Sequence, residues 1–182
     1  MAAVAGPRFP GLWDPKTMNV HIRELDLAES ERLERCTVLL RANHDLKLSL
    51  CDALETVADG LPDQFDIQTC LTLSRCILPT VRKAHLLEEE ELFPLLLRLT
   101  EQAPALAASI ERLRREHCED EDFAEEITGL LEDFANHGAA ANPETAGYML
   151  RGFFSSLRRH VAFERECLFA LADSACRKGK PR

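Results

Sequence analysis

Apolar residues recur every three, four and seven positions along four long segments of the chain, a spacing that places them on one face of an α-helix. The segments run from about residue 26 to 59, 66 to 100, 104 to 136 and 142 to 176, and glycine and proline gather between them. The fourth segment opens with Asn142, Pro143 and Glu144, which is typical of a helix start. Each segment is long enough for a helix of about 50 Å.

Short links between long helices favour antiparallel neighbours, so we predict an all-α protein, an antiparallel up-down-up-down four-helix bundle. The bundle is expected over residues 27–176, with an irregular N-terminal arm at 1–26 and a basic tail at 177–182. Pro79 and Pro94 fall inside the second segment, where a proline removes a backbone hydrogen bond. The apolar period continues through both prolines, so we expect one helix there.

One histidine lies within the apolar stripe of each segment, near its middle: His44, His85, His117 and His160. A glutamate follows three of them four residues later, on the same helix face: Glu89, Glu121 and Glu164. In an antiparallel bundle the midpoints of the helices meet at one height, so these donors should converge. A lone buried histidine is usually a hydrogen-bonded core residue, and a His–Glu pair is often a salt bridge. Four helices carrying such donors together favour a metal site instead.

The donor set also indicates the kind of metal. Buried carboxylates are costly without a compensating charge, and a cation supplies one. Six or seven donors are too many for one tetrahedral zinc ion. Imidazole combined with carboxylate suits iron, with manganese as the alternative. We therefore predict two iron ions that share carboxylates.

Composition narrows the range of partners. The net charge of −9 argues against binding to nucleic acid or to an anionic membrane surface. No run of 18 apolar residues predicts a transmembrane helix, and the first residues do not read as a secretory signal. The seven cysteines are odd in number and form no C-x-x-C pair, so we expect reduced thiols and a cytoplasmic protein.

Four stretches of the chain, one per helix, resemble the hemerythrin-like HHE cation-binding family over about residues 30–175: RANHDLKLSL, HLLEEEELFPLL, LRREHCEDED and HVAFERECLFALA. The resemblance implies that the four histidines bind iron and that Glu89 and Glu164 bridge two ions, which would also share an oxo or hydroxo group. Glu121 falls where some members place a further histidine. Whether Glu88 or Glu89 is the bridge stays open.

We therefore expect a non-haem di-iron protein that binds or senses iron, oxygen or nitric oxide, with a small diatomic molecule as its ligand. Which protein partner it has, the sequence does not say. One alternative is a di-iron enzyme that acts on peroxide or nitric oxide or aids iron–sulfur repair. Another is a metal-free helical interaction module. Binding is favoured over catalysis.

Overall fold

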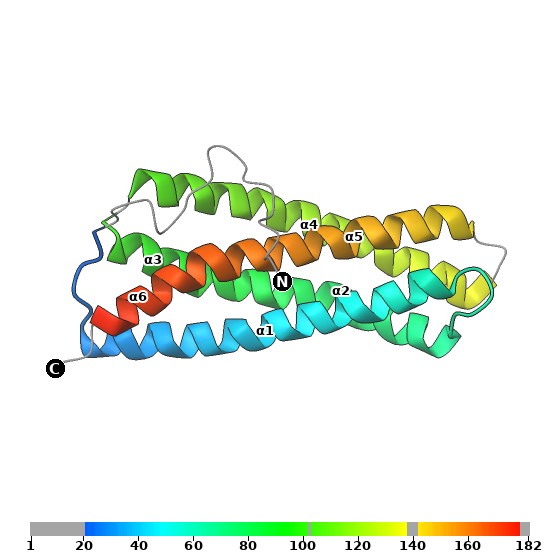
Figure 1. Cartoon of the computed structure of the whole chain (residues 1–182), viewed down its shortest axis with the longest axis horizontal. Helices are drawn as coiled ribbons and strands as arrows, with labels where there is room; N and C mark the ends of the chain where they lie inside the picture. Colours follow the sequence, from blue (N-terminus) through cyan, green and yellow to red (C-terminus); the bar gives the residue numbers. More distant parts are fainter. Residues whose placement is uncertain (1–20, 102, 138–141, 179–182) are drawn as a thin grey trace, which may run out of the picture.

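The computed structural model describes residues 21–101, 103–137 and 142–178, and all regular structure in these ranges is helical. The all-α prediction is therefore confirmed for this part of the chain. The helices form four rods (Figure 1). Two rods are single helices, α1 (Leu27–Gly60) and α4 (Pro104–His137). The others are composite: α2 (Ile67–Leu87), η1 (Glu88–Leu92) and α3 (Phe93–Leu99) form one, and α5 (Pro143–Glu164), η3 (Arg165–Phe169) and α6 (Ala170–Lys178) form the other.

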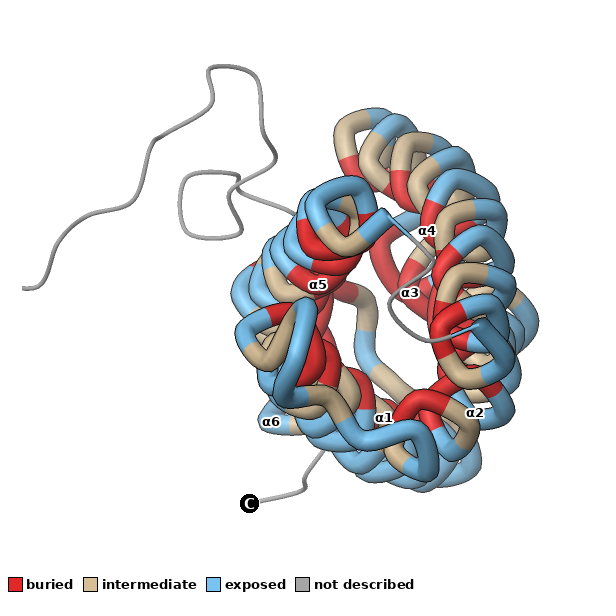
Figure 2. The backbone as a smooth tube through the Cα atoms, turned by 90° about the vertical axis from the view of Figure 1, so that its right-hand side faces the viewer, coloured by how far each residue is buried: buried red, intermediate tan, exposed pale blue. Residues whose placement is uncertain are grey.

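Each rod packs against two neighbours, so the four surround a common interior. Helix α2 contacts α1 and α4, and α5 contacts the same two helices. The view along the bundle in Figure 2 shows buried residues on the inner side of the rods and exposed residues on the outer side. This arrangement follows from the sequence pattern, because an apolar stripe that repeats every three or four residues covers only one side of a helix.

Polar side chains define the starts of three helices. The side chain of Asp26 accepts a hydrogen bond from the backbone N–H of Glu29 at 2.8 Å, and the Glu29 side chain reaches back to the Asp26 N–H, which makes a capping box. Asp66 accepts from the N–H of Thr69 at 2.8 Å. Asn142 accepts from two backbone N–H groups at 3.1 Å, which confirms the predicted start of α5.

Both composite rods pass through one π-helical turn directly beside a buried glutamate. Turn η1 begins at Glu88, and η3 begins one residue after Glu164. Pro94 follows η1 in the first turn of α3, where the π turn passes into the α-helix. Pro79 lies inside α2, as the sequence predicted. A π turn holds more residues than an α turn, so it changes which residues face the interior on either side of it.

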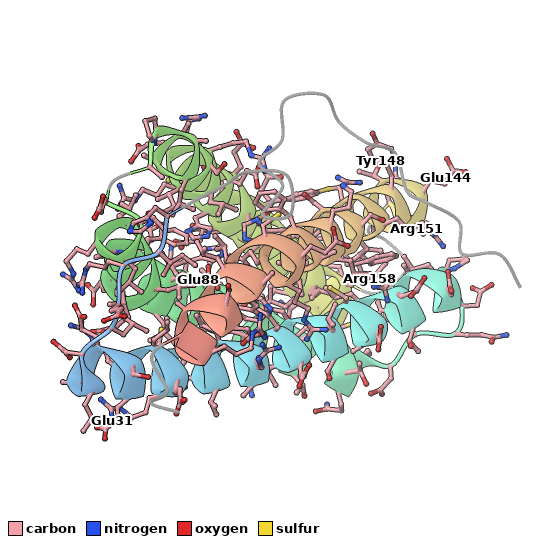
Figure 3. The ribbon with its side chains drawn as sticks, turned by 60° about the vertical axis from the view of Figure 1, so that its left-hand side comes forward. Glu31, Glu88, Glu144, Tyr148, Arg151 and Arg158 are labelled. Atoms are coloured by element: carbon pink, nitrogen blue, oxygen red, sulfur yellow. The ribbon has the colours of Figure 1, made fainter. Side chains whose placement is uncertain are left out.

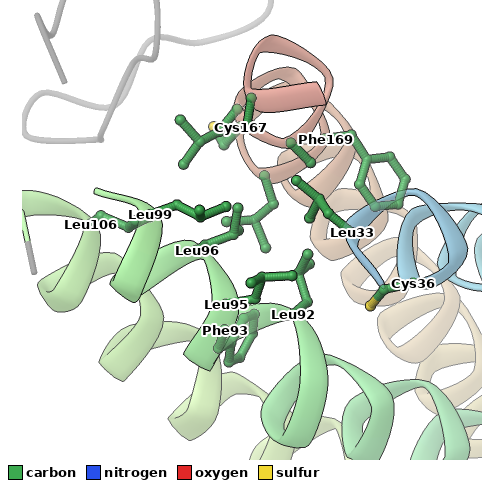
Figure 4. Close-up of a cluster of buried hydrophobic side chains, with 14 of the residues drawn as sticks. Leu33, Cys36, Leu92, Phe93, Leu95, Leu96, Leu99, Leu106, Cys167 and Phe169 are labelled. Carbon is green, nitrogen blue, oxygen red and sulfur yellow. The ribbon is translucent and has the colours of Figure 1, made fainter. Parts of the chain in front are cut away.

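The bundle has two hydrophobic cores, one toward each end. The α3/α6 core lies beside α3 and α6 (Figure 4) and includes Leu33, Phe93, Leu96, Leu106 and Phe169. The α2/α5 core lies toward the other end and includes Leu54, Ile77, Ile127, Leu150 and Phe153. Most of these side chains have less than 2% of their surface exposed, so burial of apolar area is the main stabilising contribution.

Ion pairs on the outside connect α5 to α1 (Figure 3). Arg151 Nη2 lies 2.9 Å from Asp59 Oδ1, and Arg158 Nη2 lies 2.6 Å from Asp52 Oδ1 and 2.7 Å from Glu55 Oε2. Exposed pairs of this kind contribute about 0–1 kcal/mol each. They help to fix the register of the two helices more than they stabilise the fold.

The two ends of the described chain differ in part from the sequence predictions. Most of the predicted arm, residues 1–20, lies outside the described residues. Residues 21–26 are not helical, yet Ile22 is buried in the α3/α6 core and the Arg23 N–H donates to the Leu99 carbonyl at 3.0 Å. Helix α6 continues to Lys178, two residues past the predicted end of the bundle at 176. Cys36, Cys51, Cys70, Cys76 and Cys118 are free thiols.

Candidate metal centre

A layer of buried polar residues separates the two hydrophobic cores. On each rod a histidine lies between the residues that belong to one core and those that belong to the other, namely His44 on α1, His85 on α2, His117 on α4 and His160 on α5. Their exposed fractions are between 1% and 5%. The four histidines therefore lie at one height of the bundle, as the sequence predicted.

Three of the histidines form a compact group. The rings of His85 and His117 stack at a centroid distance of 3.9 Å with 5° between their planes. The His160 ring lies 5.3 Å from His117 and 5.9 Å from His85. One nitrogen from each of the three lies within 4.8 Å of the other two. Burial lowers the pKa of His85, and the nearby Lys47 charge lowers it further, so this imidazole is neutral and its ring nitrogen is free to act as a ligand.

Two buried glutamates, each with 1% of its surface exposed, lie between this group and His44. Glu164 Oε2 is 3.0 Å from His44 Nε2, while Oε1 is 3.3 Å from His160 Nε2. Glu88 Oε1 is 3.8 Å from His44 Nε2, while Oε2 is 3.1 Å from His117 Nε2. Each carboxylate therefore directs one oxygen toward His44 and the other toward the group of three. This is the position from which a carboxylate can bridge two cations.

Carboxylates outside the centre hold two of the imidazoles in place. His117 Nδ1 lies 2.6 Å from Glu89 Oε1, and His85 Nδ1 lies 3.0 Å from Glu121 Oε1. A carboxylate oxygen that accepts a hydrogen bond from Nδ1 leaves Nε2 of the same ring, which faces the centre, to act as a ligand. A carboxylate behind the imidazole is the usual support of a metal-binding histidine.

His160 has two acids behind it, both at longer distances. Its Nδ1 lies 3.4 Å from Glu116 Oε2 and 3.6 Å from Asp120 Oδ2. Burial alone would lower the pKa of His160, but the charge of Glu164 and contacts with Glu116 and Glu164 raise it to about 10. Burial raises the pKa of the Asp120 carboxyl. In the absence of metal, His160 therefore favours its protonated form.

His44 and Lys47 make up the α1 side of the centre. The His44 ring stacks on Phe169 at a centroid distance of 4.8 Å. Lys47 is completely buried, and its Nζ lies 3.7 Å from Glu88 Oε1. Burial alone would raise the pKa of Glu164, but the charges of His160 and Lys47 hold it well below the usual value. Glu164 therefore favours its ionised form although it is buried.

Many buried polar atoms in this layer have no hydrogen-bond partner among the described residues. They include Nε2 of all four histidines and both oxygens of Glu88 and Glu164. The atoms approach one another at 3.0–3.3 Å, but their geometry is not that of hydrogen bonds. An unsatisfied buried polar group costs about 1–3 kcal/mol, and more when it is charged. A cation at their centre would compensate this cost, so the donors fit a metal.

The chemistry of the donors agrees with a hard or borderline divalent metal. Imidazole suits iron, zinc and copper, and carboxylate oxygens favour iron or manganese. One group of mutually close donors consists of His117, His160, Glu88 and Glu164. With His85 added, the centre offers five donors before His44 is counted, which exceeds the four of a closed zinc site.

Five of the seven residues predicted from the sequence as metal ligands come together here: His44, His85, His117, His160 and Glu164. Glu89 and Glu121 are not among the clustered donors, because they lie behind His117 and His85 with 38% and 28% of their side chains exposed. The choice between Glu88 and Glu89 was open in the sequence, and it is Glu88 that enters the centre.

Sequence reasoning missed Glu88 as a firm choice, and it missed Lys47 and Asp120 altogether. Each lies three residues after a histidine, whereas the carboxylates had been sought four residues after one. Spacings of three and four both lie on the same helix face, so Asp120 could have been found from the pattern. Glu88 stands three residues after His85, so the same spacing points to it, and the π turn begins at this residue.

No described helix is long and apolar enough to cross a membrane. No curated protein and no solved structure gave a significant match to the chain. Comparison with known families matches residues 37–172, most of the chain, to the hemerythrin HHE cation binding domain. This match covers all four histidines and both buried glutamates, and it confirms the resemblance seen in the sequence. The chain belongs to the hemerythrin HHE cation-binding family.

Proposed function

We propose that this chain is a non-haem iron protein that holds a pair of iron ions in the bundle core and uses them to bind or sense iron, oxygen or nitric oxide. The observation that carries the proposal is the layer of buried imidazoles and carboxylates whose inward atoms have no hydrogen-bond partner among the described residues. A helical module without metal would bear the full cost of burying these groups.

The pair of ions is supported by the way the two glutamates span the centre. His85, His117 and His160 would hold one ion, together with Glu88 Oε2 and Glu164 Oε1. His44 would hold the other, together with the remaining oxygen of each glutamate. Iron bound to such nitrogen and oxygen donors supplies reversible changes of oxidation state and affinity for diatomic molecules.

The chain's own residues would keep this chemistry dry and oriented. Phe169 lies against the His44 ring, and Phe93 stacks near His117 at a centroid distance of 5.7 Å. These rings belong to the α3/α6 core and exclude water from that side. Glu89 and Glu121 hold the Nδ1 protons of their histidines, so that both Nε2 atoms stay directed inward.

We also propose an antiparallel up-down-up-down order for the rods and a cytoplasmic location. The order is supported by the short connections at 61–66 and 100–103 and by the contacts between successive rods. The location is supported by the free cysteines. Burial raises the pKa of Cys36 and of Cys51 to about 11, so these two thiols remain protonated and unreactive, as expected of core residues.

The proposal is tested by metal analysis of the full chain purified under argon from iron-supplied cells. We expect iron to copurify, and we expect the absorption spectrum of the ferrous protein to change when nitric oxide or air is admitted. His117→Leu should lose the iron and the spectral response. His137→Ala is the matched control, because His137 is an exposed histidine of the same helix and its removal should change neither.

Two results would contradict the proposal. Wild-type protein that contains no metal after both aerobic and anaerobic preparation, and that folds equally well with His117→Leu, would indicate a metal-free interaction module. Iron-loaded protein whose spectrum ignores oxygen and nitric oxide would leave an iron-holding protein without the proposed diatomic ligand.

A further inference from the structure

Lys47 is a buried cation inside a centre built from cation ligands. Its side chain has no exposed surface, and its Nζ has no hydrogen-bond partner among the described residues. Buried lysines usually extend their ammonium group to solvent along the protein surface. The ammonium group of Lys47 does not reach solvent, and its Nζ lies 3.7 Å from Glu88 Oε1. Its ammonium therefore lies within the polar layer itself.

The position of Lys47 makes the two sides of the centre chemically different. Toward α4 and α5, Glu88 Oε2 and Glu164 Oε1 face the imidazoles of His117 and His160. Toward α1, the other two carboxylate oxygens face His44, and Glu88 Oε1 also faces Lys47. One side thus has three histidines, and the other has one histidine and an ammonium group.

The grouping of donors shows the same asymmetry independently. Among the described residues, the groups of three or more mutually close donors are His85 with His117 and His160, and Glu88 with His117, His160 and Glu164. His44 belongs to neither group. The carboxylates whose charges act on Lys47 are Glu88, Glu164 and Asp120. A single ammonium thus already neutralises part of the negative charge that a second metal ion would neutralise.

We propose that Lys47 makes the two metal positions unequal, so that one iron ion binds tightly beside His85, His117 and His160 and a second binds much more weakly beside His44. This inference rests on the proposed iron-binding function and adds its regulation. A divalent ion on the His44 side comes close to a fully buried positive charge, and the repulsion between them weakens its binding. The second position then fills only when iron is abundant, which is how a centre reports iron supply.

The test is an anaerobic titration of the metal-free full chain with ferrous ions, followed by calorimetry, with bound iron counted after equilibrium dialysis. We expect the wild-type protein to bind the second ion at least about a hundredfold more weakly than the first. Lys47→Met keeps most of the length of the side chain and removes its charge, so the two steps should come within about tenfold of each other. Lys83→Met removes an exposed lysine of α2 and should titrate like the wild type.

A wild-type protein that binds two ions with equal affinity, or a Lys47→Met protein with the wild-type separation between steps, would overturn the inference. Binding of no iron by any of the three proteins would overturn it together with the proposed function, and that result differs from both of the others. The wild type alone also gives an answer if Lys47→Met does not fold. Loaded with one equivalent of iron and oxidised in air, it should show the EPR signal of isolated ferric ions in nearly every chain. A silent spectrum, which indicates coupled pairs, would overturn the inference.

Discussion

Three consecutive glutamates, Glu88, Glu89 and Glu90, offer a direct test of which carboxylate enters the centre. Each can be changed to glutamine, which keeps the shape of the side chain and removes its charge. Glu88 is buried with both oxygens directed at the imidazoles and Lys47, Glu89 lies behind His117, and Glu90 is exposed. We expect the affinity for the first ferrous ion to fall most for Glu88→Gln, less for Glu89→Gln and not measurably for Glu90→Gln.

The expected sizes follow from these positions. Two unit charges about 4 Å apart at an effective dielectric constant near 20 interact by about 4 kcal/mol. Removing the Glu88 charge should therefore weaken binding by about a thousandfold or more, since about 1.4 kcal/mol corresponds to tenfold. Glu89 acts only through the Nδ1 proton of His117, and loss of such a partner costs about 10- to 100-fold in metal affinity.

The assay is competition for ferrous ions against a coloured chelator under argon, with circular dichroism of each metal-free variant as the control for folding. The reasoning would be refuted if Glu89→Gln lost as much affinity as Glu88→Gln or more. It would also be refuted if Glu88→Gln stayed within tenfold of the wild type while folding normally. Either result would mean that Glu89, as one reading of the sequence had it, supplies the bridging carboxylate.

Further predictions concern stability. Asn142→Ala should destabilise the metal-free chain by about 1 kcal/mol in urea unfolding because two backbone N–H groups of α5 lose their acceptor, whereas Asn142→Ser should retain most of the stability. Leu54→Ala leaves a cavity in the α2/α5 core and should lower the free energy of unfolding by about 2–5 kcal/mol in the same assay. Iron affinity should stay unchanged because this core lies away from the centre. A shift in iron affinity would show that the core and the centre are coupled. The melting temperature of the metal-free chain should be highest at about pH 6.5, because the lowered pKa of His85 removes stability as the pH falls below that value. The pKa of Glu164 is lowered from 4.5, so its stabilising contribution is lost as the pH falls through the folded value, and the pKa of His160 is raised from 6.5 to about 10, so its contribution is lost as the pH rises through that range. A melting temperature that stayed level from pH 6 to pH 10 would contradict the assignment for His160.

The fold could be predicted from the sequence largely because helix periodicity and the start signals agree. The apolar stripe, the acids at 26 and 66 and the Asn142–Pro143 start point to the same four segments, and the helices in the structure begin at Leu27, Ile67, Pro104 and Pro143. The stripe says nothing about π turns, because the extra residue of such a turn leaves the average period almost unchanged. The apolar pattern therefore predicted one uninterrupted helix where the structure has α2, η1 and α3.

The candidate site was predictable as a set of histidines but only partly as a set of carboxylates. A histidine in an apolar stripe faces the interior together with that stripe. The four histidines His44, His85, His117 and His160 could therefore be placed together. In a run of four consecutive glutamates the side chains point in several directions around the helix. The run alone therefore does not show which glutamate faces the interior. Lys47 could not have been found, because a lysine on a helix is expected in water unless the tertiary structure holds it inside.

The two π turns also change the rotation of each composite rod between the metal layer and the α3/α6 core. In an α-helix each residue turns the next by about 100°, so the ligand residues and the core residues beyond them would normally be locked to one rotation. With η1 between His85 and Leu96, and η3 between His160 and Leu171, each half of a rod keeps its own rotation. Deleting one residue from either turn would swing the distal helix by about 100° and carry its apolar side chains out of the core. The length of each turn is thus what keeps the ligand face and the apolar face of one rod directed into the same interior.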